Sequence, residues 1–269
     1  MTTHHAVAGM LPAVVRLAED AGRAIVSIYN EGFSVEHKDD RSPLTEADMA
    51  AHHLIVDGLT ALEPPLPVLS EESAAVPFAE RQRWLEYWLV DPLDGTREFI
   101  KRNGEFTVNI ALIRDGYPVL GVIHVPVSGV TYHACQGGGA YKHEPGHEPV
   151  PIHVRPWNGG RLVVAGSRSH RSPAFDRFLA KVGDYDIVSM GSSLKSCLVA
   201  EGQADVYVRL GPTSEWDTAA AQCIVEEAGG RLLDTRLQRL RYNTKESLLN
   251  PHFIVCGDAR HDWRRYLPE

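Results

Sequence analysis

The sequence lacks the features that mark secreted and membrane-spanning proteins. Its four cysteines are widely spaced and form no C-x-x-C pair, which argues against a zinc cage or a disulfide framework and favours reduced thiols. No stretch approaches the ~20 apolar residues of a membrane span, and the N-terminus has no basic region typical of a signal peptide. We therefore expect a cytoplasmic protein without an integral membrane segment. Peripheral association with the inner membrane is kept as an alternative.

Positive charge is also scarce in this chain. Its 269 residues include 27 Lys and Arg against 35 Asp and Glu, a formal net charge of -8. Because a surface that grips DNA or RNA is basic, a nucleic-acid polymer is not expected as a partner. A small anion can still bind where basic groups gather locally or where metal ions supply positive charge.

Hydrophobic periodicity predicts two helices near the N-terminus, over residues 6–29 and about 46–62, with a polar turn between them. Short apolar runs predict strands over 67–70 and 84–91. Residues 106–143 are β-rich segments cut by turn signals, which indicates an antiparallel meander. The N-terminal part is therefore expected to be a sheet with helices beside it.

A segment over 143–160 is rich in Pro, His and Gly and has no periodicity. We interpret it as a junction between an N-terminal α+β half (1–142) and a C-terminal α/β half (161–269). In the second half strands and helices alternate, which implies helices stacked on a sheet and an α/β (α+β) fold class. The expected strands are 161–167, 185–190, 204–210 and 231–234, and the expected helices are 172–183, 192–202 and 216–230.

Acidic residues stand where predicted elements begin or end. Asp91 ends a strand and Asp94 follows in the loop DPLDGT, Glu71 follows the strand 67–70, and Asp217 opens a helix. Each has an ordinary structural explanation, as a turn residue, a solvated side chain or a helix N-cap. Together they are what an all-oxygen site for a hard cation such as Mg²⁺ requires.

Three further residues lie beside these carboxylates. Asp48, in T-E-A-D, fits a capping box with Thr45. Gly95 permits a close approach by a ligand, and Thr96 opens a short helix whose backbone N–H groups attract anions. The loop DPLDGT thus offers carboxylates for a cation and amides for a phosphate.

Three motifs, LSEES, DPLDGTREF and WDTAAA, in this order and spacing, resemble those of the magnesium-dependent, lithium-sensitive phosphatase superfamily. This superfamily includes inositol monophosphatases, fructose-1,6-bisphosphatases and bisphosphate nucleotidases, and the resemblance covers nearly the whole chain. The stretches DGTREFIKRNGEFTVNIALI and GSSLKSCLVAEGQADVYVRLGPTSEWDTAAA resemble the bisphosphate nucleotidase branch. Inositol monophosphatases more typically have a TNF-type continuation after D-G-T.

The resemblance implies an αβαβα layered sandwich and removal of the 3'-phosphate of adenosine 3',5'-bisphosphate, a small-molecule nucleotide, during sulfate assimilation. It implies two or more Mg²⁺ ions, with Asp94 bridging them, and a pair, Asp48 and Thr96, that activates water. The implied metal ligands are Glu71, Asp91, the carbonyl of Leu93, Asp94 and Asp217. The implied substrate contacts are the amides of Gly95 and Thr96 and the side chains of Ser167, His170, Ser192, Ser193, Lys195 and Arg209.

Several alternatives stay open at this point. The enzyme is alternatively an inositol monophosphatase or a related sugar phosphatase. Lys195 is equally well a helix residue with an extended side chain and Arg209 an ordinary charge at a strand end. A metal-binding scaffold is disfavoured because both Asp48 and Thr96 are present, and a two-carboxylate glycosidase because there are three acidic clusters. A homodimer is kept as an alternative to a monomer.

Overall fold

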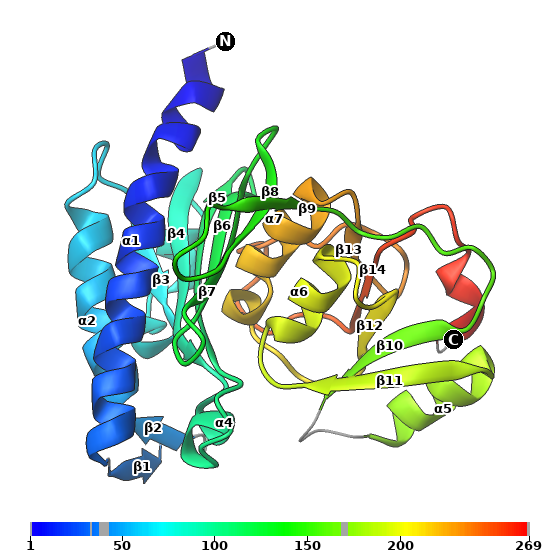
Figure 1. Ribbon diagram of the computed structural model, residues 1–269. Coiled ribbons are helices and arrows are strands. Elements are labelled where there is room, and N and C mark those ends of the chain that lie inside the picture. Colours follow the sequence, from blue (N-terminus) through cyan, green and yellow to red (C-terminus); the bar gives the residue numbers. More distant parts are fainter. Residues whose placement is uncertain (1, 33, 38–42, 168–171, 268–269) are drawn as a thin grey trace.

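Helices and two β-sheets alternate in five layers, which confirms the predicted αβαβα sandwich (Figure 1). The computed structural model describes residues 2–32, 34–37, 43–167 and 172–267. A seven-stranded sheet and a five-stranded sheet lie roughly side by side, with helices outside each sheet and between them. None of the helices in these ranges combines the length and the apolar character needed to cross a bilayer.

The first outer layer consists of α1 (Thr2–Glu31) and α2 (Glu46–Thr60), close to the predicted bounds. Both helices bury an apolar stripe against the seven-stranded sheet, represented by Ile25 on α1 and Ile55 on α2. The segment between them was expected to be only a polar turn, and this is wrong. Two three-residue strands, β1 (Val35–His37) and β2 (Pro43–Thr45), pair there antiparallel. Such short strands leave no readable alternation of apolar and polar residues.

The seven-stranded sheet has the order β3-β4-β5-β6-β7-β8-β9. Its first pair is parallel, and every later pair is antiparallel, which confirms the predicted meander. Three short elements connect its early strands. They are the one-turn 3₁₀-helix η1 (Glu71–Ser73) and the helices α3 (Phe78–Arg81) and α4 (Thr96–Ile100). The strands are Val68–Ser70 (β3), Glu86–Asp94 (β4), Thr107–Arg114 (β5), Tyr117–Val125 (β6), Val130–Cys135 (β7), Gly139–His143 (β8) and Val150–Ile152 (β9).

The five-stranded sheet has the order β11-β10-β12-β14-β13. Strand β10 is parallel to both neighbours, whereas β14 is antiparallel to β12 and β13. Strand β14 was not predicted. The strands are Leu162–Ser167 (β10), Tyr185–Met190 (β11), Val206–Arg209 (β12), Arg231–Asp234 (β13) and Phe253–Cys256 (β14), and the other elements are Pro173–Val182 (α5), Leu194–Ala200 (α6), Glu215–Asp217 (η2), Ala219–Glu227 (α7) and Trp263–Tyr266 (η3).

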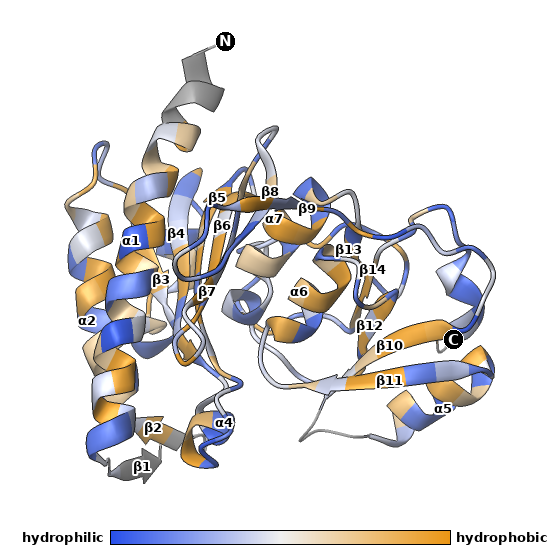
Figure 2. Ribbon diagram, in the orientation of Figure 1, coloured by the Kyte–Doolittle hydropathy of each residue, from blue (hydrophilic) through white to orange (hydrophobic). Residues whose placement is uncertain are grey.

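Helices α6 and α7 form the middle layer, and α5 packs with η3 on the far side of the second sheet. Figure 2 shows mostly hydrophobic colour on α6 and on β10, which face the interior. Gly121 on β6 lies against α7, and a Cβ at this position would be 2.4 Å from the carbonyl oxygen of Ala220. The glycine therefore lets the sheet and the helix that follows Asp217 approach closely.

The segment 143–160 is partly built into the first sheet. Strand β9 pairs with β8, so residues 150–152 extend the meander before the chain crosses to β10. The division into halves at 1–142 and 161–269 stays a prediction.

Candidate active site

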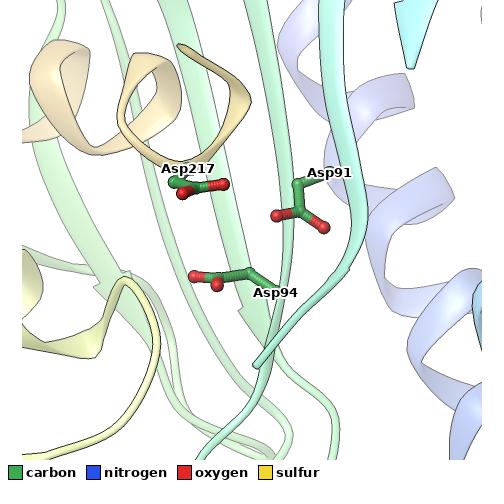
Figure 3. Close-up of side chains that lie close together, drawn as sticks. All are labelled: Asp91, Asp94 and Asp217. Carbon is green, nitrogen blue, oxygen red and sulfur yellow. The ribbon is translucent and has the colours of Figure 1, made fainter. Parts of the chain in front are cut away.

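The carboxylates Asp91 and Asp94 belong to one strand, β4, and not to a strand and a following loop as predicted. Asp91 pairs with Asn109 and Asp94 with Thr107. The chain therefore advances three residues along β4 where β5 advances two, and this extra residue is a β-bulge. In a regular strand, residues three apart point to opposite faces. The extra residue of the bulge brings both carboxylates to the same side, facing Asp217 (Figure 3).

Asp217 reaches this side from the second half of the chain. It ends the turn η2, and its Oδ2 accepts a hydrogen bond from the backbone N–H of Ser214 at 2.9 Å. The expectation that Asp217 is the N-cap of the next helix is wrong, because α7 begins at Ala219 with Thr218 as its N-cap. Among the described residues, carboxylate oxygens of Asp91, Asp94 and Asp217 all lie within 4.8 Å of one another.

The electrostatics of this cluster favour a cation. Asp91 is 1% exposed, and burial, followed by the charges of Glu71 and Asp94, raises the pKa of its carboxyl group well above the usual value. The pKa of Asp217 is raised in the same way by burial and by Asp94. Buried like charges oppose ionisation unless positive charge lies among them. An all-oxygen donor set of this kind fits a hard divalent cation such as Mg²⁺.

Glu71 and Leu93 complete the predicted donor set. Glu71 begins η1 directly after β3, and it lines the same cleft as Asp91. The carbonyl oxygen of Leu93 lies 3.4 Å from the Thr96 hydroxyl, and Leu93 lines the cleft as well. The structure therefore brings all five predicted donors to one place, from three separate parts of the chain.

Asp48 forms the predicted capping box and also reaches Thr96. Its Oδ2 accepts hydrogen bonds from the backbone N–H and the hydroxyl of Thr45, at 2.7 and 2.6 Å, as in a capping box. Its Oδ1 lies 3.4 Å from the Thr96 hydroxyl. The cap thus fixes a buried carboxylate behind Thr96, which lines the cleft.

Gly95 is the residue between the bulge and α4. Its φ of 92° lies in the left-handed region, and a Cβ would be 3.3 Å from both the carbonyl oxygen of Glu105 and Cβ of Ser192. Only glycine fits without strain. A glycine here leaves the backbone of the loop open to the cleft.

A hydroxyl network that the sequence did not predict holds Asp94. Ser192 and Ser193, which are expected to contact the nucleotide, have hydroxyls that lie 2.6 and 2.8 Å from Oδ2 of Asp94 and donate to it. Thr107 bonds Ser192 at 2.6 Å, and the side-chain amide of Asn109 donates to Ser193 at 3.0 Å. The available signal was the pair of polar residues two apart in the otherwise apolar strand TVNIALI.

Two cations line the same cleft. Lys195 is 5% exposed, and burial lowers its pKa to about 8 although Asp94 favours the charged form. Its Nζ donates to the carbonyl oxygen of Ser192 and lies 5.3 Å from the centroid of the Tyr207 ring. Arg209 ends β12 and donates to the carbonyl oxygen of Pro212 at 3.0 Å. One cleft thus combines an acidic and a basic part.

The cleft has a volume of about 360 Å³. Of the predicted residues, Asp48 lies behind it, and His170 lies outside the described residues. The predicted residues that line it are Glu71, Asp91, Leu93, Asp94, Gly95, Thr96, Ser167, Ser192, Ser193, Lys195, Arg209 and Asp217.

A five-layer αβαβα sandwich with a carboxylate cluster in its cleft is typical of a class of metal-dependent enzymes. The model of the inositol monophosphatase family matches residues 7–262, and this chain belongs to that family. The family is metal-dependent, in agreement with the acidic cluster of Asp91, Asp94 and Asp217.

Individual relatives are similar over nearly their full length. The chain is 50% identical over 248 residues to the 3'(2'),5'-bisphosphate nucleotidase CysQ of Salmonella typhimurium, covering 91% of this chain and 99% of the relative. It is 43% identical over 266 residues to the protein of the same name from Aggregatibacter actinomycetemcomitans, covering 98% and 96%. Among solved structures, CysQ from Bacteroides thetaiotaomicron, a bacterial member of the inositol monophosphatase family, matches with a TM-score of 0.82 and 43% identity, covering 94% of this chain and 98% of that one.

Proposed function

We propose that this protein is a magnesium-dependent 3'(2'),5'-bisphosphate nucleotidase that converts adenosine 3',5'-bisphosphate to AMP and phosphate. The names of its relatives support the reaction, and one observation on this chain carries it. The cleft with the Asp91–Asp94–Asp217 cluster also contains Lys195 and Arg209. A cleft with two regions of this kind suits a substrate with one phosphate held through metal ions and a second phosphate held by cationic side chains.

Two or more Mg²⁺ ions are proposed as the cofactor. The residues that would hold them are Glu71, Asp91, the carbonyl oxygen of Leu93, Asp94 and Asp217. When bound, Mg²⁺ supplies positive charge that polarises the scissile phosphate and acidifies the attacking water. The Ser192 and Ser193 hydroxyls keep the carboxylate of Asp94 oriented towards the cluster.

Proton transfer is assigned to Thr96 and Asp48. As the hydroxyl oxygen of Thr96 accepts a proton from water in the cleft, its own proton passes to Oδ1 of Asp48, 3.4 Å away. The capping bonds from Thr45 hold Asp48 in place during this step. The open backbone at Gly95 brings amide groups to the oxygens of the phosphate.

The second phosphate is assigned to Lys195 and Arg209. Arg209 lies at the end of β12 and also lines a neighbouring cavity that continues from the cleft through Ser167 and Tyr207. This gives the nucleotide part of the substrate room beyond the acidic cluster.

The proposed reaction belongs to the sulfate assimilation pathway. The cytoplasm is the proposed compartment, since all four cysteines are buried and free.

A phosphate-release assay tests this proposal. Purified protein with Mg²⁺ is given adenosine 3',5'-bisphosphate, inositol 1-phosphate and fructose 1,6-bisphosphate in parallel. We expect preference for the nucleotide, and inhibition by Li⁺. Preference for inositol 1-phosphate would replace the proposal with the inositol monophosphatase alternative, and no release from any of the three would reject both.

A further inference from the structure

The segment 243–250, which runs from Asn243 to Asn250, lies along the turn η2 that carries Asp217. Its middle residues are exposed, yet an asparagine anchors each end. Between the anchors, the backbone N–H of Glu215 donates to the carbonyl oxygen of Leu248 at 2.8 Å. The segment therefore follows η2 from one side of Asp217 to the other.

The first anchor joins the segment to the N-terminal half. Arg81 is 2% exposed and donates through its guanidinium group to the side-chain oxygen of Asn243 and to the carbonyl oxygen of Glu246. The side-chain amide of Asn243 donates in return to the carbonyl oxygen of Arg81. The backbone N–H of Asn243 donates to Oε2 of Glu215 at 2.7 Å, two residues before Asp217.

The second anchor holds the same turn from the other end. The side-chain amide of Asn250 donates to the carbonyl oxygen of Ser214 and to the hydroxyl of Thr218, at 2.6 and 3.0 Å. Its backbone N–H donates to the carbonyl oxygen of Thr213 at 2.8 Å. Thr218 follows Asp217 directly, so the bonds from Asn243 and Asn250 enclose Asp217 along the chain.

The location of Arg81 gives this arrangement a consequence for the metal site. Arg81 ends α3, the helix that follows η1, and η1 begins with Glu71. The contact between Arg81 and Asn243 therefore links α3, which follows η1 along the chain, with the segment 243–250, and the backbone N–H of Asn243 in turn bonds Glu215 of η2. Both of these carboxylates line one cleft, although they come from different halves of the sequence.

We propose that Arg81 and the segment 243–250 are positioning elements that set the Mg²⁺ affinity of the site by fixing Asp217 relative to Glu71. The inference rests on the proposed function, since it assigns both carboxylates to the metal ions. Residues behind metal ligands typically change affinity by about 10- to 100-fold when they are altered. Neither Arg81 nor Asn243 lines the cleft, so neither is expected to contact substrate.

The test uses two substitutions that each remove the contact between Arg81 and Asn243, one from each residue. Arg81→Lys keeps the positive charge but loses the planar fork that reaches two acceptors. Asn243→Gly removes the side chain while it keeps the backbone N–H towards Glu215 and tolerates the φ of 55° at this position. The matched control is Arg155→Lys, which alters the bidentate pair of Arg155 with buried Asp205, outside the cleft.

The test measures Mg²⁺ binding to the metal-free protein by titration calorimetry, without substrate. We expect the dissociation constant to rise about ten-fold in each single variant and by no more in the double variant, because both remove the same link. Saturating Mg²⁺ should restore kcat. Arg155→Lys should lower the melting temperature and leave the dissociation constant unchanged.

Three results would overturn the inference: an unchanged dissociation constant in Arg81→Lys and Asn243→Gly, effects that multiply in the double variant, or no binding of Mg²⁺ by the wild-type protein. The proposed function fails separately. A wild-type protein that binds Mg²⁺ but leaves adenosine 3',5'-bisphosphate intact would reject the nucleotidase, while the binding data would still decide on the positioning role.

Discussion

Replacing Asp91 by asparagine should raise the stability of the metal-free protein. It should also reduce the stability that the protein gains when Mg²⁺ binds. Asp91 is buried, and burial together with the charges of Glu71 and Asp94 opposes its ionisation. Asparagine removes the charge but keeps the Oδ1 acceptor, which receives the backbone N–H of Leu93 at 3.1 Å. The fold therefore loses a repulsion and keeps its local hydrogen bond.

The size of the effect follows from the spacing of the cluster. Two unit charges at 4.8 Å, the largest separation within the group, repel by roughly 3.5 kcal/mol at an effective dielectric constant of about 20. This is the repulsion from a single neighbour, and we take it as the scale of the effect. With about 2 °C per kcal/mol for a chain of this size, the melting temperature without metal should rise by about 7 °C.

Calorimetric melting at pH 8, with a chelator and with saturating Mg²⁺, measures both halves of this prediction. The wild-type protein should gain stability from Mg²⁺, and Asp91→Asn should gain much less because it lacks a ligand charge. Asp115→Asn is the control, since Asp115 is an exposed residue in the turn beyond the other end of β5. A metal-free Asp91→Asn protein that melts at or below the wild-type temperature would refute the reasoning.

Three further perturbations have defined outcomes. Asp94→Asn should lower phosphate release by at least about 100-fold while circular dichroism shows an intact fold, since it alters the carboxylate assigned to bridge the metals; normal turnover would contradict that assignment. Gly121→Ala should cost about 1–3 kcal/mol in urea unfolding, because its Cβ would be 2.4 Å from the carbonyl oxygen of Ala220, whereas Gly9→Ala, with nothing within 4 Å, should not destabilise. His124 is buried, and burial lowers its pKa from 6.5 to about 4. The unfolded state therefore binds the extra proton first, so stability should fall by up to roughly 3 kcal/mol between pH 6.5 and 4, and His124→Gln should flatten this loss in a series of pH-dependent melts.

Features that depend on neighbouring residues were predictable from the sequence. The main helices, the meander and the capping box of Thr45 with Asp48 follow from local periodicity and cap chemistry, and the structure confirms them. The contact between Asp91, Asp94 and Asp217 is not a local feature, but the resemblance of the motifs around them predicts that these carboxylates lie together. The structure brings them together.

Features that depend on distant partners were not predictable in the same way. The bulge in β4 exists because Asp91 and Asp94 pair with Asn109 and Thr107 on β5, and no rule for a single strand contains that register. The serines before α6 bond Asp94 across 98 and 99 residues of sequence, and no local pattern indicates this contact. Asp217 lies one residue outside the expected cap position because η2 precedes α7.

The anchoring of η2 by Asn250 has a consequence for biosynthesis. The chain emerges from the ribosome from its N-terminus, so β4 with Asp91 and Asp94 is available long before the residues that hold Asp217. Strand β14, which pairs with β12 and β13, follows later still. A nascent chain can therefore complete the meander before Asp217 is held beside Asp91 and Asp94.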